Sequence, residues 1–113
     1  YLRAREYHWQ FSGELAKLFA DYHVGMTYRL LGRFDEAESW LRPVLAWAER
    51  LGNNSAIGQA SEDLGEIQAA RGNKTGALKL LKRARDMYRA EGLDKSMPDV
   101  WENINARIRQ LEQ

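Results

Sequence analysis

The chain has 113 residues, a length that suits one domain and lies near the lower limit for burying a self-sufficient hydrophobic core. Hydrophobic residues make up 44% of it and charged residues 29%, which is typical of an ordinary folded chain and excludes a disordered tail. The net charge of +1 gives no electrostatic reason to expect binding to nucleic acid or to an acidic membrane surface.

The absence of cysteine excludes disulfides, thiol catalysis and cysteine metal sites, and it fits a reducing compartment, so we expect a cytoplasmic protein. No apolar run is long enough to span a membrane, and no charged-then-apolar leader opens the chain. Because the chain opens on Tyr1 in the middle of a helical pattern, we expect it to be a fragment of a longer protein.

An all-α fold of about six helices, with no strand, is predicted from the 3.6-residue hydrophobic period. The predicted breaks coincide with glycine or asparagine and fall at Ser12-Gly13, Gly32, Gly52-Asn53-Asn54, Gly72-Asn73 and Gly92. They leave helices near 2–11, 14–31, 34–51, 55–71, 74–91 and 97–112.

The sequence repeats at a spacing of 40 residues. This spacing places Gly25 on Gly65, Gly32 on Gly72, and Ala37 on Ala77. Glycine inside a helix costs about 1 kcal/mol relative to alanine, so Gly25 and Gly65 should mark places where another helix approaches closely. Ala37 and Ala77 stand where the second helix of each pair would meet that glycine.

Two segments carry this pattern: Leu64-Gly65-x-x-Gln68 followed by Gly72, Ala77, Leu81 and Ala84, and Val24-Gly25-x-x-Tyr28 followed by Gly32-Arg33-Phe34-Asp35-Glu36-Ala37 and Leu41. They resemble tetratricopeptide repeats over nearly the whole chain. The period exceeds the usual value of about 34 residues, and in this it is similar to the extended repeats of kinesin light chains and of bacterial regulatory proteins. A HEAT-type array would also suit the period, but it would not need the two glycines and the alanine.

The resemblance implies one domain over residues 1–113, built as a solenoid of antiparallel helix pairs. It divides the chain into the second helix of a truncated repeat, two repeats and a closing helix, over 1–13, 14–53, 54–93 and 94–113. It also implies a module that binds proteins and has no catalytic residues, no cofactor and no metal.

In such a solenoid the first helix of each pair lines a concave face. The resemblance therefore implies that a partner contacts the following residues: Phe19, Tyr22, Met26, Arg29, Leu30, Gln59, Glu62, Glu66, Ala69, Glu102 and Arg109. The groove would be apolar at one end and acidic at the other, which suits an apolar segment carrying a basic residue.

Two interpretations of the apolar end remain open. Its side chains either contact the partner or are covered by residues 1–11 or by a preceding repeat. If they contact the partner, Tyr22→Ala and Met26→Ala should weaken binding and leave the melting temperature nearly unchanged.

Enzyme signals are weak, because no motif fixes a nucleophile or a carboxylate pair near His8 or His23, the two histidines of the chain. The leading hypothesis is therefore a groove for a peptide or helix of another protein. The alternative is a regulatory segment of a larger bacterial signalling or transcription protein, which senses a ligand or an inhibitor. A domain upstream of Tyr1 that binds DNA or hydrolyses nucleotides would favour that alternative.

The N-terminal end is expected to self-associate as a homodimer, because its first helix is apolar on more than one side. The residues concerned are Tyr1, Leu2, His8, Trp9 and Phe11. A two-fold contact or an exchanged helix would cover this apolar surface.

Overall fold

The structure is a computed structural model that describes the backbone of residues 2–113 and the side chains of residues 13–113. It contains α1 (Leu2–Leu30), α2 (Phe34–Leu51), α3 (Asn54–Ala70), α4 (Lys74–Ala90), α5 (Leu93–Ser96) and α6 (Pro98–Glu112). No strand occurs among the described residues, so the predicted all-α helical repeat is confirmed. The division of the chain into repeats at 14–53 and 54–93 stays a prediction.

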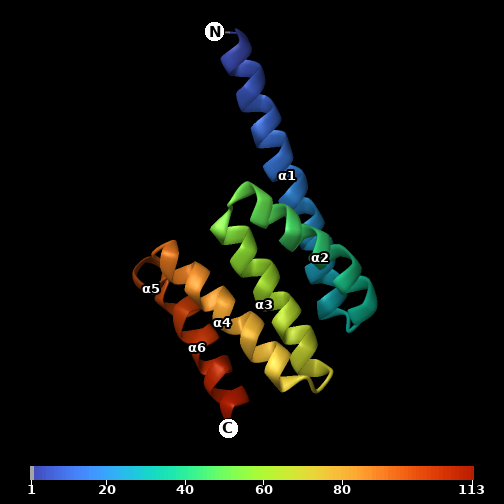
Figure 1. The fold of residues 1–113 in the computed structure, drawn as a ribbon, viewed down its shortest axis with the longest axis vertical. Coiled ribbons are helices and arrows are strands. Elements are labelled where there is room, and N and C mark those ends of the chain that lie inside the picture. Colours follow the sequence, from blue (N-terminus) through green and yellow to red (C-terminus); the bar gives the residue numbers. More distant parts are fainter. Residues whose placement is uncertain (1) are drawn as a thin grey trace.

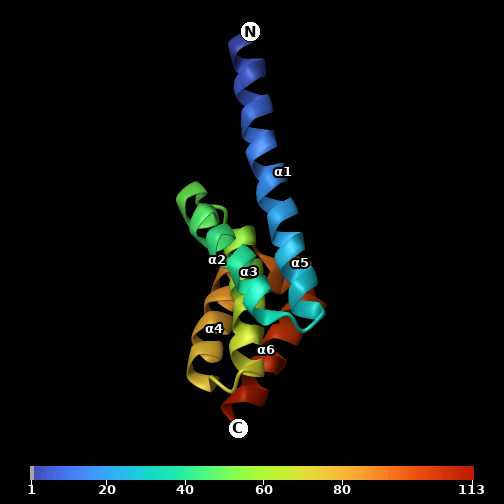
Figure 2. The same ribbon diagram turned by 90° about the vertical axis from the view of Figure 1, so that its right-hand side faces the viewer.

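The helices are stacked side by side, with α3 in the centre, the α1–α2 pair on one flank and α4 with α6 on the other (Figure 1). Figure 2 shows α2 and α4 toward one side of the stack and α1 and α6 toward the other. We call the side formed by α1, α3 and α6 the inner face. The N-terminal half of α1 extends beyond the other helices.

Four of the predicted helix ends are set by a glycine with left-handed backbone. Gly32, Gly52, Gly72 and Gly92 have φ between 66° and 82°, a region that costs other residues strain. Asn53 and Asn73 follow two of them and cap α3 and α4, each accepting a hydrogen bond from a backbone N–H at 3.0 Å. Glycine and asparagine together therefore end one helix and begin the next.

The predicted break at Ser12-Gly13 is wrong, because α1 runs without interruption from Leu2 to Leu30. Gly13 is not among the glycines with positive φ, so it lacks the backbone conformation that ends the other helices. The helix count reaches six because α5, a single turn that was not predicted, lies between α4 and α6.

The two mid-helix glycines mark close helix contacts, as predicted. A Cβ on Gly25 would lie 2.6 Å from Leu41 Cγ, and one on Gly65 would lie 2.9 Å from Leu81 Cγ and 3.3 Å from the carbonyl oxygen of Ala77. The nearest side chains are thus leucines, one turn beyond the expected alanines. The two leucines, Leu41 and Leu81, and the two alanines, Ala37 and Ala77, are all buried.

Gly65→Ala should destabilise the fold by about 1–3 kcal/mol, because the added methyl must displace Leu81 and a backbone carbonyl. Gly13→Ala is the matched control, since no atom lies within 4 Å of its added Cβ and alanine favours the helix by about 1 kcal/mol. Urea denaturation measures both free energies of unfolding. Equal stability of the two variants would contradict the close helix contact.

Candidate functional site

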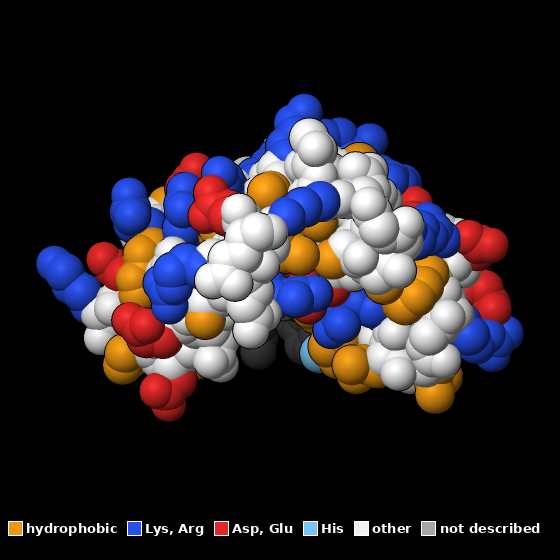
Figure 3. All heavy atoms as spheres, turned by 90° about the horizontal axis from the view of Figure 1, so that it is seen from below, with side chains coloured by type: hydrophobic (Ala, Val, Ile, Leu, Met, Phe, Trp, Pro, Cys, Tyr) orange, Lys and Arg blue, Asp and Glu red, His pale blue; other side chains and the backbone are white. Residues whose placement is uncertain are grey.

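The predicted partner-binding residues belong to α1, α3 and α6, the helices that form the inner face, and they differ in exposure. Leu30 is 67% exposed, and Phe19 and Met26 are partly buried against the core. Arg29, Gln59, Glu62, Glu66 and Ala69 are half-buried, and Glu102 and Arg109 are exposed. Viewed along its long axis, the molecule is hollowed between two lobes, with acidic and basic side chains gathered in the hollow (Figure 3).

Tyr22 does not line an open surface. Its side chain is 8% exposed and belongs to the core, and its hydroxyl donates a hydrogen bond to Asp63 Oδ2 at 2.5 Å. Burial, and then the neighbouring Asp63 carboxylate, raise the pKa of Tyr22 well above its usual value. The expectation that Tyr22→Ala leaves stability unchanged is therefore corrected, because this variant removes a core side chain and a buried hydrogen bond.

Asp63 joins α1 to α3. It is 4% exposed and accepts hydrogen bonds from the Tyr22 hydroxyl and from Arg29 Nε, with which it also forms an ion pair. Two donors therefore compensate the burial of its charge. Sequence analysis did not include Asp63 among the partner-binding residues, because its donors are distant in the chain.

Glu62 lies beside this cluster and accepts a hydrogen bond from the Tyr88 hydroxyl of α4 at 2.7 Å. Its pKa is raised, chiefly because burial disfavours the charged form, with the Asp63 and Glu66 carboxylates adding to the effect. The hydrogen bond from Tyr88 and the charge of Arg29 act in the opposite direction but do not cancel it. Glu62 is thus an acid whose charge is incompletely compensated.

Glu66 joins α3 to α6, since its carboxylate pairs with Arg107 Nε at 2.8 Å. The three inner helices are therefore linked through carboxylates on α3, one toward α1 and one toward α6. Of the acidic residues predicted for the groove, Glu66 is thus paired with a cation, whereas Glu62 and Glu102 have no ion pair among the described side chains. Arg107 was missed by sequence analysis, because the groove pattern alone does not show which carboxylates have a cation within reach.

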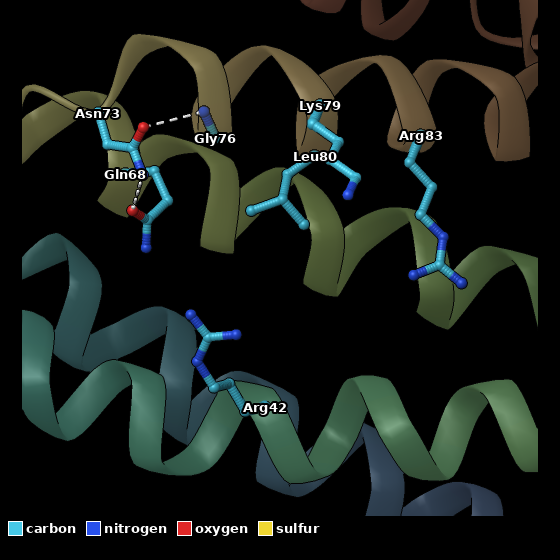
Figure 4. Close-up of a pocket in the computed structure, with 7 residues that line it drawn as sticks. All are labelled: Arg42, Gln68, Asn73, Gly76, Lys79, Leu80 and Arg83. Carbon is cyan, nitrogen blue, oxygen red and sulfur yellow. Dashed lines mark hydrogen bonds between the residues drawn. The ribbon is translucent and has the colours of Figure 1, made fainter.

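A cavity lies between α2 and α4, close to the end of α3. Its volume is about 430 Å³, and it is lined by Arg42, Gln68, Asn73, Gly76, Lys79, Leu80 and Arg83. Figure 4 shows Arg42 reaching toward it from α2 and the side chains of Lys79 and Arg83 reaching from α4. We call it the cationic pocket.

Two of its three cations already have partners. Arg42 pairs with Glu38 at 3.0 Å and Arg83 with Glu49 at 3.1 Å. Among the described side chains, no carboxylate pairs with Lys79. The pocket therefore has an excess of positive charge and can accept an anionic group.

No group of three or more histidine, aspartate or glutamate side chains in the described part of the chain is placed to hold a metal ion. No helix in that part is both long enough and apolar enough to cross a bilayer. The expected cytoplasmic location stays a prediction.

The raised pKa of Glu62 predicts a pH-dependent gain in stability for Glu62→Gln. The folded state holds the Glu62 proton more tightly than the unfolded state, so stability falls as pH rises from the usual glutamate pKa through the raised value. Glutamine removes this loss and can still accept the Tyr88 hydrogen bond. The variant should therefore gain stability relative to the parent between pH 4 and pH 7, measured by urea denaturation.

Glu91→Gln, at an exposed position that ends α4, is the matched control and should show a nearly constant difference from the parent. If Glu62→Gln also differs from the parent by a constant amount, the burial of Glu62 carries no stability cost.

Comparison with known proteins agrees with this architecture. The tetratricopeptide repeat family matches residues 18–90, which is more than half of the chain and includes α2, α3 and α4 entirely. No curated protein and no solved structure matches the sequence. With paired helices, close glycine contacts and this match, the chain belongs to the tetratricopeptide repeat family.

Proposed function

We propose that the chain holds a segment of another protein along the inner face formed by α1, α3 and α6. Tetratricopeptide repeats generally mediate contacts between proteins, and this membership supports a binding role without catalysis. The inner face also has the mixture of apolar and charged groups that suits a protein segment.

The observation that carries the proposal is that the Glu62 carboxylate is half-buried and has a raised pKa. A half-buried carboxylate with a raised pKa is unfavourable for the free protein, and a cation beside it would favour its charged form. Asp63 and Glu66 already have Arg29 and Arg107 as partners, whereas the partner of Glu62 among the described side chains is the Tyr88 hydroxyl alone. Glu62 is therefore the carboxylate of this cluster that a partner's basic residue would bind.

The surroundings of Glu62 indicate the rest of the partner segment. Tyr22 lies close enough to Glu62 for the Glu62 charge to raise the pKa of Tyr22. On α1, Phe19 stands one turn before Tyr22 and Met26 one turn after it. Leu30 extends this apolar strip and is largely exposed. We therefore propose a segment with one lysine or arginine at Glu62 and apolar residues toward α1.

A peptide selection tests this proposal. Peptides of random sequence selected on the immobilised protein should be enriched in a single lysine or arginine flanked by apolar residues. Affinity for a selected peptide, measured by fluorescence polarisation, should fall about tenfold or more in Glu62→Gln, which corresponds to about 1.4 kcal/mol or more for a lost charge pair. Glu91→Gln should bind like the parent. Unchanged binding to Glu62→Gln would contradict the proposed site.

The second candidate function is the regulatory segment that senses a ligand, and the cationic pocket favours it. Its three cations and the side-chain amides of Gln68 and Asn73 suit a small anion with several oxygens. A ligand between α2 and α4 would bridge the second helices of the two pairs.

Pyrophosphate and citrate at constant ionic strength are suitable probes of this pocket. Each should raise the melting temperature of the parent, because a ligand that binds the folded state stabilises it. The rise should be lost in Lys79→Gln and kept in Lys95→Gln, whose lysine is exposed on α5. If both variants lose the rise in melting temperature equally, the anions act through the overall charge of the protein, and the cationic pocket is not a binding site.

A further inference from the structure

One side of α1 is left uncovered by the described side chains of residues 13–113. Val24 is 37% exposed and Leu31 is 65% exposed, and Ala20 and Thr27 on the same side are exposed as well. These four residues recur at helical spacing, so they form one continuous strip. We call this strip the open face.

Three of the four corresponding residues of the second pair are buried, the exception being Arg71, the counterpart of Leu31. At the 40-residue spacing, Ala20, Val24 and Thr27 correspond to Ala60, Leu64 and Ile67, and each of these three is 0% exposed. They pack in one core cluster with Val44 and Ala48 of α2, the helix that precedes α3. The open face is therefore the surface that a preceding helix like α2 would cover.

Residues 2–11 have the sequence pattern of such a helix. At the same spacing, Ala4, Tyr7 and Phe11 correspond to Val44, Trp47 and Leu51, three apolar residues of the C-terminal half of α2, while His8 stands at the position of Ala48. In the structure these residues continue α1 in a straight line away from the stack, so they do not cover the open face of their own chain (Figures 1 and 2). The side chains of residues 1–12 lie outside the described part of the structure.

We propose that two copies of the chain exchange these segments, so that residues 2–11 of each copy lie antiparallel along residues 14–23 of the other, where they cover Ala20 and reach Val24 at one end of the open face. The two-fold axis then passes near Ser12 and Gly13. The α2–α3 hairpin turns at Gly52-Asn53, which brings residue 48 opposite residue 57. The exchanged pair brings residue 8 of one copy opposite residue 17 of the other.

The straight form of α1 is what makes exchange between copies possible. A left-handed glycine at the turn would fold residues 2–11 back on their own chain, whereas a continuous helix presents them to a second copy. The interface is self-complementary and closes with two copies, as a two-fold dimer requires. A shallow cavity of about 390 Å³ lined by His23, Val24, Thr27 and Tyr28 lies where Leu2 of the other copy would arrive. This inference does not depend on the proposed groove function.

Cross-linking distinguishes exchange from its alternatives. Because the chain has no cysteine, the variant Ala4→Cys with Ala20→Cys carries one thiol on each of the two strips and no others. Treatment with a short bismaleimide should give covalent dimers on a denaturing gel. A link within one chain would show that the segment folds back, and the absence of any link would show that the face stays open. Either outcome would overturn the exchange.

Sedimentation equilibrium gives the second test. The parent should form dimers, and Val24→Glu should weaken association about tenfold or more by placing a charge in the apolar contact. Met97→Glu is the matched control, since Met97 is 49% exposed before α6 at the opposite end of the stack. Gly13→Ala should strengthen association several-fold by favouring the straight helix. A parent that remains monomeric, or equal effects of the two glutamate variants, would rule out the proposed interface.

Discussion

The contact between a glycine of one helix and a leucine of the next is the constraint on which the stack depends. Gly25 meets Leu41 and Gly65 meets Leu81, each at a distance that leaves no room for a Cβ. These contacts set how closely α1 packs on α2 and α3 on α4. Arg29 of the first pair reaches Asp63 of the second. The last helix has Asn105 at the equivalent position, and this side chain bonds to the Trp101 carbonyl of its own helix at 2.9 Å.

The two helix pairs have the same arrangement of helices and glycine contacts, but they differ in the side chains between the helices. This difference accounts for a hydrogen bond on the inner face. Where the first pair has Leu18 and Ala48, the second has Gly58 and Tyr88, and a Cβ on Gly58 would lie 2.7 Å from the tyrosine ring. A small residue on one helix thus makes space for a large one on the other. This exchange of size lets the Tyr88 hydroxyl reach Glu62, which no leucine or alanine could do.

Most helix boundaries and buried helix faces were predictable from the sequence, because residues close together in the chain determine them. The left-handed glycines end helices, asparagines begin them, and the period of the apolar residues identifies the buried sides. The unbroken α1 was not predicted, because Ser12-Gly13 resembles a turn and only the backbone conformation of Gly13 decides the matter. The buried position of Tyr22 and its bond to Asp63 were also missed. These depend on residues 41 positions apart, which a repeat pattern does not pair.

The carboxylates of α3 show how stability and binding are coupled on the inner face. Three of them lie within about one turn, and arginines from α1 and α6 compensate Asp63 and Glu66. A neutral side chain at position 62 would accept the Tyr88 hydrogen bond at lower cost, so stability alone does not account for a glutamate there. Groups that are unfavourable in the free protein concentrate where a ligand completes the arrangement. A cation bound at Glu62 would add a contact, and its attraction to the carboxylate would offset in the complex the desolvation penalty that this group has in the free protein. Occupancy of the inner face and rigidity of the α1–α3–α6 connection would therefore rise together.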